Sequence, residues 1–197
     1  MRRFATLSAV APTTLCMLLA GCGPAQDTPE EAPVTAEAPQ PASADQAVLD
    51  AALETNVRNA RLPSSGIVSS GQPDQGQVEA MRGAGAQAFI SLRPSSESGA
   101  GWEEAYATAE NVAFDRLPIT GPESLTRENV EIFADMLDEQ GGDPVVVYCG
   151  SSNRVGAMLA LKAAWIDGMD ANEALQVGLD AGLTRLEAPV RELLGLD

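Results

Sequence analysis

The segment PVVVYC, residues 144–149, constrains the fold more than any other part of this 197-residue chain. Its valines and its tyrosine leave no polar face that could lie against water, so both sides of the segment must be covered by other parts of the protein. Strands of this kind are typical of the centre of a parallel sheet that carries helices on both faces. We therefore expect residues 144–149 to form a central strand.

Patterns typical of strands and of helices alternate along the rest of the chain. Strands are expected at 66–70, 86–93 and 112–119, and helices at 43–60, 73–85, 101–111 and 154–168. A further helix is capped by Thr126 and ends at a pair of glycines, and the last two helices begin at capping-box pairs, Asp170 with Glu173 and Thr184 with Glu187. This alternation predicts an α/β fold, a three-layer sandwich with a mostly parallel central sheet.

The first 22 residues have the pattern of an export signal. Two arginines precede an apolar stretch that is too short to span a bilayer, and small residues follow it. Residues 19–22, Leu-Ala-Gly-Cys, resemble the bacterial lipobox, which implies that Cys22 is lipidated and becomes the first residue of the mature protein. An ordinary signal peptide that is cleaved nearby is the alternative.

The composition after Cys22 indicates a tether and then one domain. Residues 23–42 are rich in Pro, Ala and Glu and cannot bury enough apolar surface to fold. We expect a signal peptide at 1–21, a disordered lipid-anchored tether at 22–42 and a folded domain at 43–197. Gly23 stands where an Asp would indicate inner-membrane retention, so the expected location in the bacterial cell envelope is the periplasmic face of the outer membrane.

Charge and residue counts exclude several functions. The formal net charge is −16, so the chain offers no basic surface for nucleic acid, and a membrane would hold it only through the lipid on Cys22. The chain has no histidine, which excludes Ser-His-Asp and Cys-His catalysis and the common zinc sites that contain histidine. We expect no metal and no other cofactor. Once Cys16 and Cys22 are set aside, Cys149 is the one thiol of the exported domain, and no disulfide can form within it.

The turn after the central strand combines that thiol with an arginine. Cys149 lies at the carboxyl end of the strand, where open parallel sheets build their sites, and residues 149–154 lead into the amino end of a helix. Gly150 and Asn153 tolerate left-handed backbone, which lets the N–H groups of the loop converge on one anion, with Ser151 and Ser152 between them. Arg154 supplies a fork for two oxygens, and the positive field favours the thiolate. The alternative is a small buried cysteine beside a solvated arginine.

Several motifs in order resemble one known family. They are SGQP (70–73), ISLRPSSE (90–97), GPESLTRENV (121–130) and YCGSSNRVGA (148–157), followed by EALQVGLDAGL (173–183). Together they resemble the bacterial phosphatase-like domain found in beta-lactamase-hydrolase-like proteins, a member of the superfamily of cysteine-dependent phosphatases and rhodaneses. The resemblance covers about residues 55–195. It implies a dual-specificity-phosphatase-like fold in which Cys149 attacks phosphorus, Arg154 holds the oxygens, and water hydrolyses a cysteinyl-phosphate intermediate.

Two positions depart from the family pattern and leave other functions open. Four residues separate Cys149 from Arg154 instead of five, which shortens the loop by about 3.5 Å, and Val155 replaces the usual hydroxyl residue. A shorter loop also suits a rhodanese-like sulfurtransferase, which would carry a persulfide on Cys149 and take a sulfur-donor anion as its substrate. A module that binds an anion without turnover is the third interpretation.

A phosphatase of this family would also need a general acid on the loop that precedes the long helix. That loop is TGPES, and Glu123 is its carboxylate; Asp115 lies earlier, within the expected strand. Glu123 is equally consistent with an acidic residue that stabilises the start of a helix. Arg93, at the end of the second strand, is expected either to bind substrate at the same edge of the sheet or to be a surface arginine.

Overall fold

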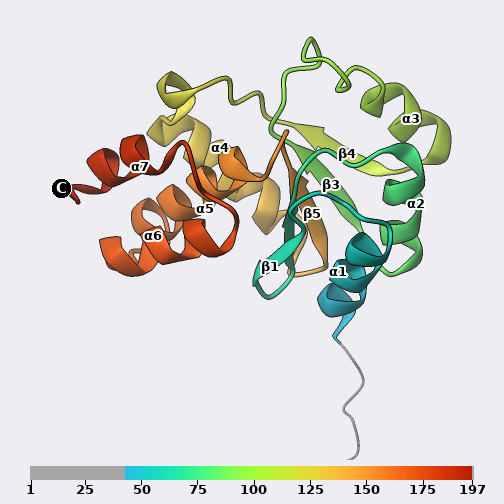
Figure 1. Ribbon diagram of the computed structural model, residues 1–197, viewed down its shortest axis with the longest axis horizontal. Coiled ribbons are helices and arrows are strands. Elements are labelled where there is room, and N and C mark those ends of the chain that lie inside the picture. The colour runs from blue at the N-terminus through green and yellow to red at the C-terminus, as the bar shows by residue number, and fades with distance from the viewer. Residues whose placement is uncertain (1–42, 197) are drawn as a thin grey trace, which may run out of the picture. The chain divides into compact units, whose positions relative to one another are not determined.

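The computed structural model describes residues 43–196. The predicted signal peptide, Cys22 and the tether all lie outside these described residues. The centre of the folded part is a five-stranded sheet with the order β1-β2-β5-β3-β4 (Figure 1). The strands are β1 (Arg61–Ser64), β2 (Ile67–Ser70), β3 (Ala88–Ser91), β4 (Ala113–Arg116) and β5 (Val145–Tyr148). All pairs are parallel except the edge pair of β1 with β2. The predicted central strand is confirmed as β5, between β2 and β3.

Helices cover both faces of this sheet (Figure 1). One face carries α1 (Ala44–Glu54), α2 (Gln75–Gly83) and α3 (Glu103–Glu110); the other carries α4 (Arg127–Asp138), α5 (Asn153–Trp165), α6 (Ala171–Asp180) and α7 (Glu187–Leu194). Side chains alternate along the strands, so Phe89 and Val146 pack towards the first group and Ile90 and Val147 towards the second. The structure thus confirms the three-layer α/β sandwich.

Burial explains why β5 occupies the centre. All of its residues are buried, and full burial of a valine-sized side chain stabilises the fold by roughly 1.5 to 3 kcal/mol. Tyr148 keeps its hydroxyl paired in this setting by donating to Glu103 Oε1 at 3.3 Å. Helix α5, the predicted apolar helix, is likewise buried along most of its length. In residues 43–196 no helix is both long and apolar enough to cross a membrane.

Four local predictions were wrong. The helix expected at 43–60 ends at Glu54, because the chain turns at Asn56 and Asn59, which both have left-handed backbone, and then forms the unpredicted strand β1. Strand β4 stops at Arg116; beyond it Leu117 N–H donates to Ser91 O and Ile119 N–H to Leu92 O, so the chain still follows β3 but leaves the regular register of the strand pair. Neither predicted capping box forms. Asp170 caps α6 by accepting from the N–H of Asn172 and does not pair with Glu173, and α7 has no side-chain cap at all.

Candidate active site

The thiol lies where the sequence predicts, at the carboxyl end of the central strand. Cys149 follows β5 directly, and its N–H donates to Ser70 O at 3.2 Å, which holds it beside the end of β2. Its exposed fraction is 1%, and α5 begins only four residues later, at Asn153. The short loop therefore joins the floor of the site to the amino end of a buried helix.

The left-handed residue of the loop is Ser152, with φ 65°, and not Gly150 or Asn153 as expected. Ser152 is fully buried, and its hydroxyl donates to Ala181 O at 2.6 Å. Gly182 faces it: a Cβ at Gly182 would stand 2.8 Å from Ser152 Cβ. A hydrogen bond from the serine side chain and the missing Cβ of its neighbour thus stabilise a backbone conformation that most residues avoid.

Apart from the Ser152 hydroxyl, residues 150–153 are held to their surroundings by their acceptors, which leaves their backbone N–H groups free. Asn153 Oδ1 accepts from the N–H groups of Thr184 and Leu186 and from the Thr184 hydroxyl, at 2.8 to 3.2 Å. Ser151 O accepts from Asn59 Nδ2 at 3.1 Å. By contrast, none of the backbone N–H groups of residues 150–153 donates a hydrogen bond to another residue of the described chain. Ser152 could therefore contact a substrate only through its backbone N–H, because its hydroxyl is already used, whereas Asn153 could use its backbone N–H or its Nδ2.

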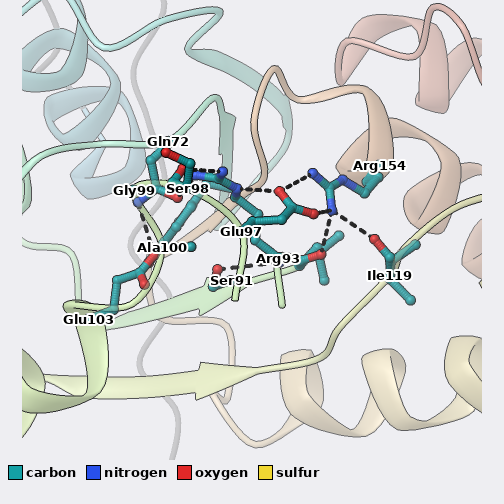
Figure 2. A network of polar contacts seen from close by, with 12 residues as sticks. Gln72, Ser91, Arg93, Glu97, Ser98, Gly99, Ala100, Glu103, Ile119 and Arg154 are labelled. Atoms are coloured by element: carbon teal, nitrogen blue, oxygen red, sulfur yellow. Dashed lines mark hydrogen bonds and ion pairs between the residues drawn. The ribbon is translucent and has the colours of Figure 1, made fainter. Parts of the chain in front are cut away.

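One edge of the Arg154 guanidinium is paired and the other is free. Nη1 donates to Glu97 Oε1 at 2.6 Å and to Ile119 O at 2.8 Å, and Nη2 donates to Glu97 Oε2 at 2.9 Å (Figure 2). Within residues 43–196, no oxygen atom accepts from Nε, which shares the opposite edge with the second hydrogen of Nη2, and the Cys149 side chain also bonds to the guanidinium. Hydrogen bonds to Glu97 and, to a smaller extent, the neighbouring Cys149 side chain raise the pKa of Arg154. The side-on edge, which suits two oxygens of one ligand, remains available.

Glu97 is the site residue that the sequence analysis did not identify. Its carboxylate lies between Arg154 and Arg93, whose Nε donates to Glu97 Oε2 at 2.7 Å (Figure 2). The hydrogen bonds and charges of these two arginines, Arg154 first, lower the pKa of Glu97 from 4.5 to about 2. Only its position at the end of the ISLRPSSE motif, four residues after Arg93, could have indicated a role.

Arg93 lies at the predicted edge of the sheet, but it is buried and serves the protein. Besides Glu97, it donates to Gln72 Oε1 at 2.7 Å and to Ser98 O at 2.8 Å. These contacts fix the turn 94–98 that carries Glu97. Arg93 therefore braces Glu97, which in turn braces Arg154, and the surface interpretation of Arg93 does not apply.

The two candidate acids lie in different settings. Glu123 belongs to the short 3-10 helix η1 (Pro122–Ser124), on the segment whose Ile119 carbonyl accepts from Arg154. It is exposed, and its carboxylate accepts from the Thr120 hydroxyl at 2.9 Å. A backbone N–H and that hydroxyl lower the pKa of Glu123, so it is ionised at neutral pH.

Asp115 lies further from the loop along the sheet. Asp115 pairs with Ile90 of β3, and Ile90 pairs with Val147 of β5. Val147 is two residues before Cys149, so Asp115 lies short of the strand end that carries the thiol. It is also two strands away from β5, which is about 10 Å. Between the two candidates, Glu123 is thus the one whose segment touches Arg154.

In the described residues, no group of three or more acidic or cysteine side chains could hold a metal ion.

Solved structures share this fold. A DUF442 proposed phosphatase of Shewanella putrefaciens superposes with a TM-score of 0.57 at 19% identity, over 75% of this chain and 97% of that one. TpbA of P. aeruginosa gives a TM-score of 0.56 at 18% identity, over 73% and 87%. A proposed phosphatase of Neisseria meningitidis gives 0.56 at 20% identity, over 68% and 97%. No model of a known protein family matches the sequence, and no curated protein matches it.

The chain has the fold of these bacterial phosphatase-like proteins. This confirms, at the level of the fold, the resemblance that its motifs carry. The likeness covers 87 to 97% of each of the three structures, and at identities of 18 to 20% it shows a shared fold. What the site does is inferred from its own geometry.

Proposed function

We propose that this protein hydrolyses phosphate monoesters through Cys149. The observation that carries the proposal is the set of free donors around the thiol. Four consecutive N–H groups, of residues 150–153, have no acceptor among the described residues, one edge of Arg154 has no oxygen acceptor there, and all of them follow directly after the strand that leads to Cys149. Donors arranged in this way favour an anion with several oxygens, and they stabilise a thiolate.

The proposed reaction has two steps. The Cys149 thiolate attacks phosphorus, so that an S–P bond forms while the bond between phosphorus and the ester oxygen breaks, and the departing oxygen takes up a proton. Water then attacks phosphorus, the S–P bond breaks, and phosphate leaves with the thiolate restored. In both steps the loop N–H groups and the free edge of Arg154 would hold the non-bridging oxygens, whose charge is largest in the transition state.

Each bracing contact has a place in this proposal. Glu97 and the Ile119 carbonyl accept hydrogen bonds from Arg154 and hold its side chain in one conformation. The opposite edge of the guanidinium would therefore already face the ligand before it binds. Glu123 is the proposed general acid. To act it must first bind a proton, which its lowered pKa disfavours at neutral pH, and it must exchange its bond with Thr120 for one with the leaving oxygen. Substrates whose leaving group is already a weak base would need no such help.

A second candidate is sulfur transfer, favoured by the short spacing of Cys149 and Arg154. In that reaction the thiolate takes a sulfur atom from a donor anion and passes it, as a persulfide, to a thiophilic acceptor. Both reactions require the same nucleophile and the same ring of donors. Only phosphoryl transfer gains from an acid at position 123.

Parallel assays separate the candidates. The purified protein and its Cys149→Ser variant are tested with nitrophenyl phosphate and with thiosulfate plus cyanide. Hydrolysis of the phosphate ester that disappears in the variant supports the proposal. Thiosulfate turnover without ester hydrolysis would replace it with sulfur transfer, and inactivity in both assays combined with phosphate binding would leave an anion-binding module.

The place of action is proposed from the sequence. Cys22, lipidated after removal of residues 1–21, would anchor the protein at the periplasmic face of the outer membrane in a bacterial cell envelope. The acidic composition makes the lipid the source of membrane affinity, since anionic headgroups repel a chain with net charge −16.

A further inference from the structure

A polar cavity of about 420 Å³ adjoins the cysteine loop. Its lining includes Arg58, Gln72, Arg93, Ser98 and Gly150, and it contains no Asp or Glu. The cavity adjoins the loop through Gly71: its N–H donates to Arg58 O at 2.7 Å, and a Cβ at this position would stand only 3.2 Å from Gly150 O. A ligand in this cavity would therefore lie next to the first residue after Cys149.

Arg58 has no carboxylate partner although the chain is strongly acidic. Most cations in the described residues form ion pairs; four arginines form none, namely Arg58, Arg61, Arg82 and Arg185. A chain with 28 acidic residues has many ways to pair an exposed arginine. An unpaired arginine at a cavity whose lining has no Asp or Glu favours an anion from outside the protein.

The unpaired arginines also gather around the loop. Arg61 Nη1 lies against Gly182, which also packs against Ser152. Arg185 lies between Thr184 and Leu186, the two residues whose N–H groups donate to Asn153. Arg58 and Asn59 are consecutive, and Asn59 Nδ2 donates to Ser151 O. Three of the four uncompensated charges thus stand on segments that hold the loop, where their fields add.

We infer that the cavity beside Arg58 is a subsite for a second phosphate group of the substrate. The inference rests on the proposed function and deepens it, because it names a substrate class: phosphate esters that carry another phosphate a few bonds away. Arg58 is chosen over Arg61 and Arg185 because it is the one that lines a cavity together with the cysteine loop. Its side chain is exposed, so its fork can turn towards a ligand without breaking a bond inside the protein.

The test compares alkanediol bisphosphates with two, four or six carbons, as a length series, with the matching alkyl monophosphates. For the wild type, we expect kcat/KM for the bisphosphate of best length to exceed that of its monophosphate by about tenfold or more, as one added charged contact would give. Arg58→Gln should abolish most of this preference. Arg82→Gln is the matched control: it removes another unpaired arginine, at a cavity that contains Glu79 and adjoins the start of β4, and it should keep the preference.

Two results would overturn the subsite. One is a wild type that prefers no bisphosphate of any length, and the other is an equal loss of preference in both arginine variants, which would indicate a general effect of charge. If the wild type hydrolyses none of these esters, the proposed function fails. The subsite is then tested by calorimetry, which measures how tightly the same compounds bind to the Cys149→Ser variant. Tighter binding of a bisphosphate that depends on Arg58 would then support it, and equal binding would refute it. Matching melting temperatures establish that both arginine variants are folded.

Discussion

The direction of the Arg154 fork depends on one carboxylate. Glu97 occupies both inner donors of the guanidinium and is itself held by Arg93. Without its charge, the guanidinium has only carbonyl partners on that side, Ile119 O and, more distantly, Leu92 O. The free edge would then sample several directions, only some of which face Cys149.

Glu97→Gln should therefore impair turnover although Glu97 touches no substrate. We expect kcat/KM with nitrophenyl phosphate to fall about tenfold or more, with KM raised and kcat lowered together, because Arg154 would hold the ground state and the transition state less well. The control is Glu104→Gln, which removes a carboxylate from Arg116, at the other arginine cluster. Equal kinetics of the two variants would refute the bracing role.

The same carboxylate predicts a pH dependence of stability. The folded protein holds the pKa of Glu97 at about 2, below the ordinary 4.5, so its ionised form stabilises the fold. A lowered pKa contributes stability that is complete above the ordinary value and is lost as the pH falls towards about 2. Urea unfolding across that window should show a loss on the order of 1 to 2 kcal/mol, reduced by solvent screening, that Glu97→Gln lacks. Parallel curves for the two proteins would contradict this.

Glu123 should show its role through the leaving group. An acid matters when the departing oxygen is a strong base, so Glu123→Gln should slow hydrolysis of alkyl phosphates on the order of 10²-fold and that of nitrophenyl phosphate far less. The measurement is kcat/KM across phosphate esters of graded leaving-group basicity. A loss that is equally small for every ester would exclude Glu123, and the same series on Asp115→Asn would test the remaining carboxylate.

At the scale of elements, the position of Arg154 depends on how closely α5 approaches α6 and the chain after it. A Cβ at Gly156 would stand 2.5 Å from Gly178 O and closer still to Leu183 N. Both neighbours are backbone atoms, which cannot turn aside. Because Gly156 is two residues from Arg154, any separation of the helices would also move the amino end of α5.

Gly156→Ala should therefore destabilise the protein by about 2 kcal/mol or more. Gly83→Ala is the matched control, because nothing lies within 4 Å of a Cβ at the last residue of α2, and there alanine should be neutral or stabilising by up to about 1 kcal/mol. Urea unfolding measures both differences. Equal stability of the two variants would contradict the close contact.

The elements that could be predicted from the sequence are those with a local signal. Strand β5 is apolar throughout, and α4 has both a capping Thr126 and apolar residues at helical spacing, so both were found. Strand β1 carries no such signal, because its four residues include Pro63 and it pairs only at the sheet edge. Ser152 could not be identified as the left-handed residue, since its stabilising contact, Ala181 O, is 29 positions away.

In the candidate site too, residues with a local sequence signal could be predicted and residues brought together by long-range contacts could not. Cys149 and Arg154 were predictable because strand, loop and helix are consecutive in the sequence. Glu97 was not, because it meets Arg154 across 57 positions, and only the folded sheet brings the ends of β3 and β5 together. Pairings of this kind depend on strand order, which the sequence pattern leaves open.

At the scale of the whole molecule, membrane attachment is predicted to depend on one residue outside the described range. Changing Cys22 to Ala should release the protein from the membranes of a Gram-negative host, because anionic headgroups repel a chain with net charge −16. Fractionation of cells that express the two forms measures this. A Cys22→Ala protein that still sediments with membranes would refute the lipid anchor.

The central claim is that Cys149 carries the transferred phosphoryl group, and trapping that intermediate tests it most directly. The protein is mixed rapidly with nitrophenyl phosphate, quenched in acid and analysed by mass spectrometry of its peptides. We predict a gain of one phosphoryl group on the peptide that contains Cys149, together with a burst of nitrophenolate, and neither in Cys149→Ser. Sustained ester hydrolysis by Cys149→Ser, or a phosphoryl group on any other residue of the turning-over enzyme, would contradict the account.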